Sequence, residues 1–237
     1  MLTLALATVL AIEPSATAIP TAALLHAREQ LGTRAFLTGA PSCTAKSCFS
    51  LVVHVVVVDG VPVQTPLWWA GQVAAANRLF AQIDVGFVPI EVREEPAALA
   101  DVDDRKARDL LGRGDHDRGV IHVWAVRRLA DVDIPGEEIR GVHWRDRADT
   151  TRRFVILSSI AAERVLAHEL GHFFGLPHSS FAVSIMNKTP RDDPPPEQRG
   201  FHPRELATMR ARRDAMIADG TLKLPRAKRR TTAKATG

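Results

Sequence analysis

The 237-residue sequence has only two cysteines and no tyrosine, and no apolar run in it is long enough to cross a membrane. The cysteine pair has no further ligands nearby, so a second zinc site built on it is excluded. With 46% hydrophobic residues, a chain of this length can bury one sizeable core. The composition therefore favours a single domain of catalytic size.

The body of the chain also lacks an excess of basic over acidic residues. The formal net charge is +4, but the last fifteen residues, KLPRAKRRTTAKATG, hold six of the 31 basic residues and no acid. Without them the body is slightly acidic, which gives no support to a nucleic-acid-binding surface. We interpret residues 221–237 as a basic, disordered tail, with an arm for an anionic partner as the alternative.

The N-terminus begins with an apolar run of about eleven residues, followed by small residues up to Ala18. This length is typical of a signal-peptide core, and we predict a signal peptide over residues 1–18 and a secreted or periplasmic protein. A basic residue is missing before Arg28. A misassigned start or a docked N-terminal segment, in a cytoplasmic protein, is therefore the alternative.

The two cysteines, Cys43 and Cys48, lie in the N-terminal segment 19–49. Their close spacing in an exported chain favours a local disulfide. A reduced structural pair in a cytosolic protein, or an inhibitory thiolate on an active-site metal, are the other interpretations.

Alternating patterns predict an α+β domain over residues 50–220. The β-branched segment 50–60 predicts a strand covered on both faces, with His54 as a packed core residue. Thr65 and Pro66 are typical of a helix start. Further strands are expected at 84–94, 119–129, 141–145 and 152–160, with Pro89 marking an edge or irregularity in the first of these.

The polar loop between the second and third strands contains Asp115, His116 and Asp117. We expect a solvated loop there, with a structural ion as the alternative. A helix is then predicted from Ser158 or Ser159 through Gly175.

This last helix carries a histidine pattern with a chemical meaning. His168 and His172 are four residues apart and share one helix face, so their imidazoles can reach one metal ion. Gly175 permits the positive φ that ends a helix, after which His178 can return as a third ligand. Glu169 lies beside the ion, where its carboxylate can hold and activate a water.

The stretch HELGHFFGLPH (168–178) matches HExxHxxGxxH, so the sequence resembles the metzincin zinc peptidases. The resemblance implies a twisted mixed sheet with a backing helix and an active-site helix. It also implies a smaller C-terminal subdomain with a Met-turn at Met186 and a C-terminal helix over 203–220. Leu206, Met209, Met216 and Ile217 would face inward from that helix, and Gly220 would end it.

The subfamily stays unassigned. Ser179 follows the third histidine as in matrixins, whereas astacins and adamalysins place an acid there. The tyrosine ligand of astacins and serralysins is absent, and Lys188 stands at its position. His143, on the strand that borders the cleft in this family, could assist the oxyanion or could be a rim residue without a role.

The resemblance implies a zinc endopeptidase that acts on protein or peptide substrates. In it, Glu169 activates a water on Zn²⁺ held by His168, His172 and His178. A zinc hydrolase of non-peptide amides and a catalytically silent binding module are the alternatives. We expect a monomer without a nucleic-acid partner.

Overall fold

A computed structural model of the chain describes residues 43–114 and 116–225. The strands are Ser47–Val58 (β1), Val61–Pro62 (β2), Val85–Glu95 (β3), Asp101–Val102 (β4), Ile121–Val126 (β5), Arg128–Leu129 (β6), Gly141–Arg145 (β7) and Arg153–Ser158 (β8). The α-helices are Pro66–Phe80 (α2), Arg105–Leu111 (α3), Val165–Phe173 (α4) and Pro203–Ala218 (α5).

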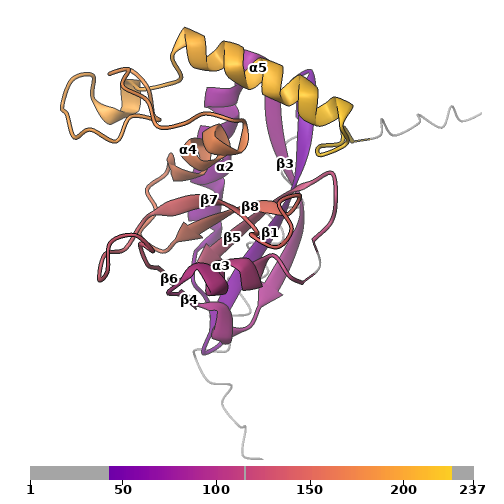
Figure 1. The fold of residues 1–237 in the computed structure, drawn as a ribbon, viewed down its shortest axis with the longest axis vertical. Helices are drawn as coiled ribbons and strands as arrows, with labels where there is room; N and C mark the ends of the chain where they lie inside the picture. The colour runs from indigo at the N-terminus through magenta and orange to yellow at the C-terminus, as the bar shows by residue number, and fades with distance from the viewer. Residues whose placement is uncertain (1–42, 115, 226–237) are drawn as a thin grey trace, which may run out of the picture.

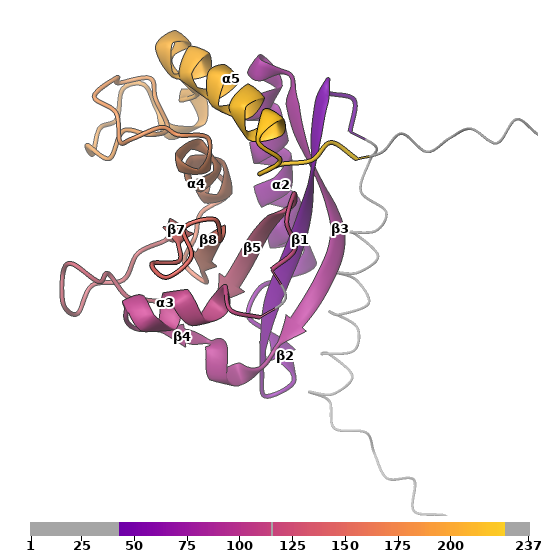
Figure 2. The ribbon, with the colours of Figure 1, turned by 45° about the vertical axis from the view of Figure 1, so that its right-hand side comes forward.

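A six-stranded mixed sheet forms the centre of the molecule, in the order β2-β1-β5-β8-β7, with β3 also paired to β1. The pairs of β1 with β3 and β5, and of β5 with β8, are parallel, whereas β7 runs antiparallel to β8. Figures 1 and 2 show α4 beside β7 and β8, and α5 across the top of the molecule. The predicted α+β fold with a mixed sheet and a C-terminal helix is confirmed.

Both faces of the sheet are covered, as the β-branched sequence of β1 predicted. One core lies between the sheet and the helices α2, α4 and α5, and contains Phe49, Leu51 and Val53 of β1. The opposite core, beneath α3, β4 and β6, contains Val56. Alternate residues of one strand thus enter two different cores.

Pro89 lies at an irregularity of an edge strand. In β3 the register against β1 shifts between Leu51 and Val52, because Leu51 pairs with Pro89 and Val52 with Glu91. Ile90 is therefore the extra residue of a bulge and is half exposed. A proline cannot donate a hydrogen bond to a sheet, which is why it is tolerated at this position.

Helix α4 begins later than predicted. Ser158 is the last residue of β8, and α4 starts only at Val165, so the expected start near Ser158 or Ser159 is wrong. The side chain of Gln72, fully buried on α2, substitutes for a capping residue. Its amide donates to the carbonyl of Ala162 at 2.8 Å and accepts from the N–H of Leu166 at 2.9 Å.

The C-terminal helix forms close to its predicted limits. Leu206, Met209 and Met216 are buried, and Ile217 packs against the same core. Gly220 has a φ of +76° just after the helix. His202 and Glu205 form a reciprocal capping box at the start of α5.

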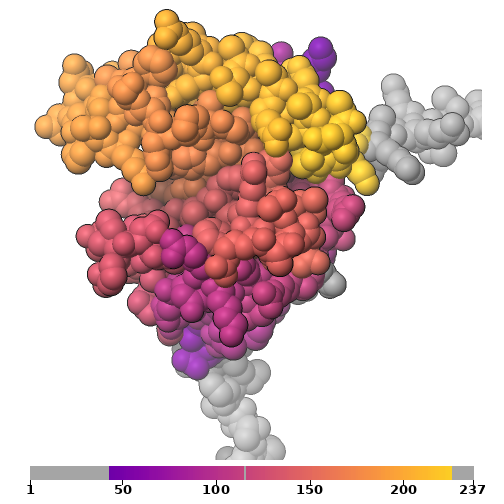
Figure 3. All heavy atoms as spheres, in the orientation of Figure 1, coloured from indigo at the N-terminus to yellow at the C-terminus, as the bar shows by residue number. Residues whose placement is uncertain are grey.

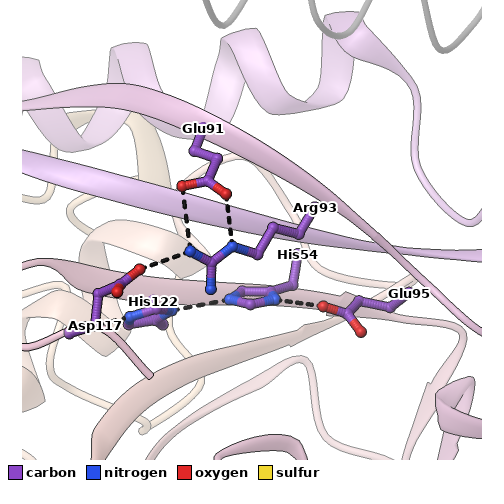
Figure 4. A network of polar contacts seen from close by, with 6 residues as sticks. All are labelled: His54, Glu91, Arg93, Glu95, Asp117 and His122. Carbon is purple, nitrogen blue, oxygen red and sulfur yellow. Dashed lines mark hydrogen bonds and ion pairs between the residues drawn. The ribbon is translucent and has the colours of Figure 1, made fainter. Parts of the chain in front are cut away.

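His54 is buried, but it belongs to a polar network and not to a purely apolar core. Its Nδ1 lies 2.6 Å from Glu95 Oε1, and its Nε2 lies 2.9 Å from His122 Nδ1 (Figure 4). The ring also stacks on Trp124, with 4.0 Å between centroids. Because the carbonyl of Asp117 can only accept, His122 donates to it through Nε2 at 3.2 Å. Neutral His122 then accepts through Nδ1 from His54 Nε2.

The loop before β5 takes part in this network. His116 stacks on His122 with 4.4 Å between centroids, and Asp117 pairs with Arg93 at 2.6 Å (Figure 4). Asp115 lies outside the described residues. Within the described ranges, no cluster of three metal-ligating side chains occurs in this loop.

The predicted signal peptide (1–18) and most of the basic tail lie outside the described residues. No helix in the described part of the chain is long and apolar enough to cross a membrane. At the start of the described chain, Cys43 and Cys48 form a disulfide with 5.9 Å between Cα atoms.

Candidate metal centre

A large cleft lies between the sheet and the segment that follows α4. Its volume is about 1510 Å³, and it is lined on one side by β7 and on the other by residues such as Asn187 and Lys188. In the space-filling view, the segments after α4 form the upper part of the molecule and the strands and their loops the lower part (Figure 3). The face of α4 that carries His168 and His172 is exposed to this cleft.

Three histidines converge in the cleft. His168 and His172 lie on successive turns of α4, and His178 follows the chain reversal after the helix. One ligand nitrogen from each side chain lies within 4.8 Å of the others, and His172 Nε2 is 3.2 Å from His178 Nε2. Among the described residues, this is the only group of three or more His, Cys, Asp or Glu side chains placed to hold a metal ion.

Two backbone carbonyls set the tautomers of the helical histidines. His168 Nδ1 lies 2.7 Å from the carbonyl oxygen of Ile185, and His172 Nδ1 lies 2.7 Å from that of Leu176. A carbonyl oxygen can only accept, so each Nδ1 carries the proton and donates it. The Nε2 lone pairs are left for a metal ion, and outer hydrogen bonds of this kind orient metal-binding imidazoles.

Burial keeps these imidazoles neutral. It lowers the pKa of His168 to about 4, with a smaller opposing effect from the hydrogen bond to Ile185. The pKa of His172 is lowered for the same reason. Neutral imidazole is the form that ligates metals, and three such nitrogens suit the donor preference of Zn²⁺.

The chain reversal that returns His178 depends on Gly175. This residue has a φ of +91°, a conformation that side chains with a Cβ rarely adopt. The N–H of Leu176 donates to the carbonyl of Gly171 at 3.0 Å. The N–H of Gly175 donates to the carbonyl of His172 at 2.9 Å. These two bonds form a Schellman motif, which satisfies the last carbonyls of α4 and turns the chain.

Met186 lies directly under α4. It is fully buried, and a Cβ added to Gly171 would lie 2.6 Å from its sulfur. Gly171, between the two helical histidines, therefore lets the methionine approach the helix backbone. Sequence reasoning singled out Met186 but missed Gly171, although a glycine inside a helical pattern is a signal of close approach.

The turn around Met186 is tied to α5 by a buried polar contact that sequence reasoning also missed. Ser184 Oγ lies 2.8 Å from both carboxylate oxygens of Glu205 and donates to that carboxylate. The same oxygen accepts from the N–H of Met186 at 3.0 Å. Glu205 also accepts from the N–H of His202 at 2.7 Å. The capping box at the start of α5 thus also fixes the methionine turn.

Glu169 lies beside the histidines and does not belong to their cluster. It is only 5% exposed, and burial raises the pKa of its carboxyl to about 8. The backbone N–H of His143, followed by the charges of Lys188 and Arg108, opposes this rise. A Cβ on Gly141 would lie 3.1 Å from Glu169 Oε1, so the backbone of β7 passes directly against the carboxylate.

His143 is half-buried and lines the cleft. Its Nε2 is enclosed without a hydrogen-bond partner in the described part of the chain, and its ring lies 5.4 Å from that of Phe173. Burial, assisted by the charge of Arg153, lowers the pKa of His143 to about 3. The imidazole is therefore neutral at physiological pH.

Part of the chain that forms this site is similar to a known protein family. Residues 111–199 match the family described as Matrixin. The resemblance of the sequence to metzincins is confirmed, and the histidine triad within the matched segment is of the kind typical of zinc binding in matrixins. Among curated proteins, none matches the sequence.

A solved structure shares the fold at low identity. Metalloproteinase-II from Bacteroides fragilis is 11% identical over 76% of this chain, with a TM-score of 0.50. The present chain spans 60% of the length of that protein. Archaemetzincin from Methanopyrus kandleri is 14% identical over 74% of this chain and 99% of its own, with a TM-score of 0.49. At 11% identity, the similarity to metalloproteinase-II shows a shared fold alone.

Proposed function

We propose that this metzincin, whose residues 111–199 belong to the matrixin family, is a zinc-dependent endopeptidase. The observation that carries the proposal is the pairing of two features in one cleft. Three imidazoles converge on one point, two of them with Nε2 left free, and a buried carboxyl group, Glu169, lies next to them without joining their cluster.

The free edge of β7 supports a polypeptide substrate. In the described sheet β7 pairs with β8 alone, and its other edge faces the cleft. An extended peptide can add to such an edge through backbone hydrogen bonds, whatever its sequence. The close passage of Gly141 against Glu169 would bring the backbone of that peptide beside the carboxylate.

When bound, Zn²⁺ would supply Lewis-acid polarisation of the scissile carbonyl and lower the pKa of water. His168, His172 and His178 would hold it through Nε2. Glu169 would take a proton from the attacking water on one carboxylate oxygen and deliver it to the leaving amine. Its high pKa, caused by burial, favours holding that proton between the two transfers.

Replacing Glu169 with Gln tests the function. The variant should keep zinc and the fold, because Glu169 is outside the histidine cluster. Loss of a general base lowers rates by about 10²–10⁴, and peptide cleavage should fall by at least that factor. Wild-type activity in Glu169→Gln would refute the proposed role. Cleavage of small amides but no peptide, or inactivity of both proteins, would point to the alternative functions.

We also propose that the protein works in an oxidising compartment, secreted or periplasmic. The joined Cys43 and Cys48 support this location, because disulfides persist mainly outside the cytosol. Gly86 of β3 makes room for the bridge, since a Cβ there would lie 2.5 Å from Cys43 Sγ.

A further inference from the structure

The cleft contains more unpaired cations than unpaired carboxylates. Six basic side chains line it without an ion pair to any carboxylate in the described ranges: Arg108, Arg140, Arg145, Arg164, Lys188 and Arg199. Among the acidic lining residues, Glu163 pairs with Arg78 and Asp133 with Arg105. The wall therefore has a positive surplus that a substrate could neutralise.

Arg108 differs from the other cations because it is buried. It is 3% exposed, and its guanidinium lies over the ring of Trp144, with 4.9 Å from Cζ to the centroid. Nη2 donates to the carbonyl of Ala130 at 2.7 Å. Nε is enclosed with no partner in the described residues. Nη1 makes no hydrogen bond within the described residues, and Arg108 lines the cleft.

The surroundings of Arg108 leave its charge without a close counter-ion. Burial lowers the pKa of its guanidinium, and Asp131 is the largest of the charges that oppose this. Asp131 makes no ion pair with Arg108, and its Oδ1 instead accepts from the N–H groups of Asp133 and Ile134. The adjacent Asp109 pairs with Arg147. A buried cation without a partner is costly, and an incoming anion would offset that cost.

The position of Arg108 relates it to a peptide on β7. Side chains alternate between the two faces of a strand, so Val142 and Trp144 lie on the face opposite to His143. Residues of a paired peptide alternate in the same way. Those on the Trp144 face of the sheet would point toward Arg108, while those on the other face would point toward α4.

We propose that Arg108 is a specificity-determining residue that receives an Asp or Glu side chain of the substrate, on the Trp144 face of β7. The inference rests on the proposed peptidase function. The carboxylate would accept a charge-assisted hydrogen bond from Nη1, in a partly enclosed site where salt screens poorly. The five other cations add a weaker preference for acidic segments, because they are more exposed to solvent than Arg108.

The test compares matched peptides. A peptide that the zinc-loaded protein cleaves is varied one position at a time, Glu against Gln, over four positions on each side of the scissile bond. At one position of the Arg108 face we expect kcat/KM to be about ten- to a hundredfold higher for Glu, from the strength of hydrogen bonds to charged groups. In Arg108→Met this Glu-to-Gln ratio should fall to about one, and Arg108→Lys should restore part of it.

Lys106→Met is the matched control, because Lys106 lies on the same helix, is exposed and does not line the cleft. Its ratio should equal that of the wild type. Thermal unfolding of each variant establishes that it is folded. Equal cleavage of Glu and Gln peptides by the wild type at every position, or an unchanged ratio in Arg108→Met, would overturn the inference and leave the peptidase function intact.

A binding measurement separates the two proposals. The same peptide pairs, labelled with a fluorophore, are titrated with full-length Glu169→Gln protein and followed by anisotropy. If Glu169→Gln binds the Glu peptide more tightly and the double variant Glu169→Gln, Arg108→Met does not, the inference is supported. This holds even if the wild type cleaves no peptide, in which case only the peptidase function fails. Equal binding of both members of every pair overturns the inference.

Discussion

Met186 lies so close to Gly171 of the active-site helix that a Cβ on the glycine would be 2.6 Å from the methionine sulfur. The contact places a fully buried side chain between the two helical histidines and the core below. A side chain can normally move away from a new methyl group, but Met186 is packed on all sides.

The first prediction follows from this contact. Gly171→Ala should lower the free energy of unfolding by about 1–3 kcal/mol, the usual cost of overpacking a core, and should weaken zinc binding by moving His168 or His172. Urea unfolding and zinc titration measure both effects. Gly114→Ala is the control, because a Cβ there meets nothing within 4 Å. Similar stability in the two variants would contradict the packing argument.

The second prediction concerns the link between Ser184 and Glu205. Ser184→Ala leaves a buried carboxylate without one of its donors, so we expect a loss of about 1–3 kcal/mol in unfolding free energy. Ser159→Ala, which removes an exposed hydroxyl bonded to the carbonyl of Arg127, should cost less. Chemical denaturation decides between them, and equal losses would show that burial at Ser184 is unimportant.

The third prediction concerns removal of zinc. The two cores do not depend on a metal, so a chelator should lower the melting temperature without unfolding the protein at 25 °C. Elemental analysis should give about one zinc per chain for the wild type and none for His172→Ala. The melting temperature of His172→Ala should be insensitive to chelator. Full zinc occupancy in this variant would refute the assignment of the site.

The fourth prediction is a pH dependence that comes from His122. Burial, and then the charges of His116 and His54, lower the pKa of His122 to about 3, whereas an unperturbed histidine titrates near 6.5. Between these values the unfolded chain binds the extra proton, so stability falls as the pH falls from about 6.5 toward 3.

His122→Gln removes this titration. Urea unfolding at pH 7 and pH 4.5 should therefore show a smaller loss of stability on acidification in the variant than in the wild type. If both proteins lose the same free energy between these pH values, His122 does not contribute to the acid sensitivity.

The fifth prediction concerns the disulfide. Intact mass under native conditions should change after reduction and alkylation by the mass of two modified thiols, Cys43 and Cys48. The doubly substituted Cys43→Ser, Cys48→Ser protein should lose about 2 kcal/mol of stability, because the closed loop is short. Two free thiols in protein purified without reductant would remove the support for export.

Local features of the fold were predictable because they depend on residues close in sequence. Thr65 accepts from the N–H of Trp68 at the start of α2, and Pro89 coincides with a bulge in β3. The start of α4 was not predictable, because it is set by Gln72 of another helix. The polar role of His54 was missed for a similar reason, since its partners Glu95 and His122 come from other strands.

The sequence by itself determined which residues could form the metal centre. Spacings of four and six residues, with Gly175 between the second and third histidines, restrict the backbone whatever surrounds it. Only the tertiary structure decided which nitrogen of each ring is free and which cation faces the substrate. The carbonyl of Ile185 and the stacking of Arg108 on Trp144 join residues far apart in the chain. Such contacts depend on how the two cores bring the elements together, and no local pattern encodes them.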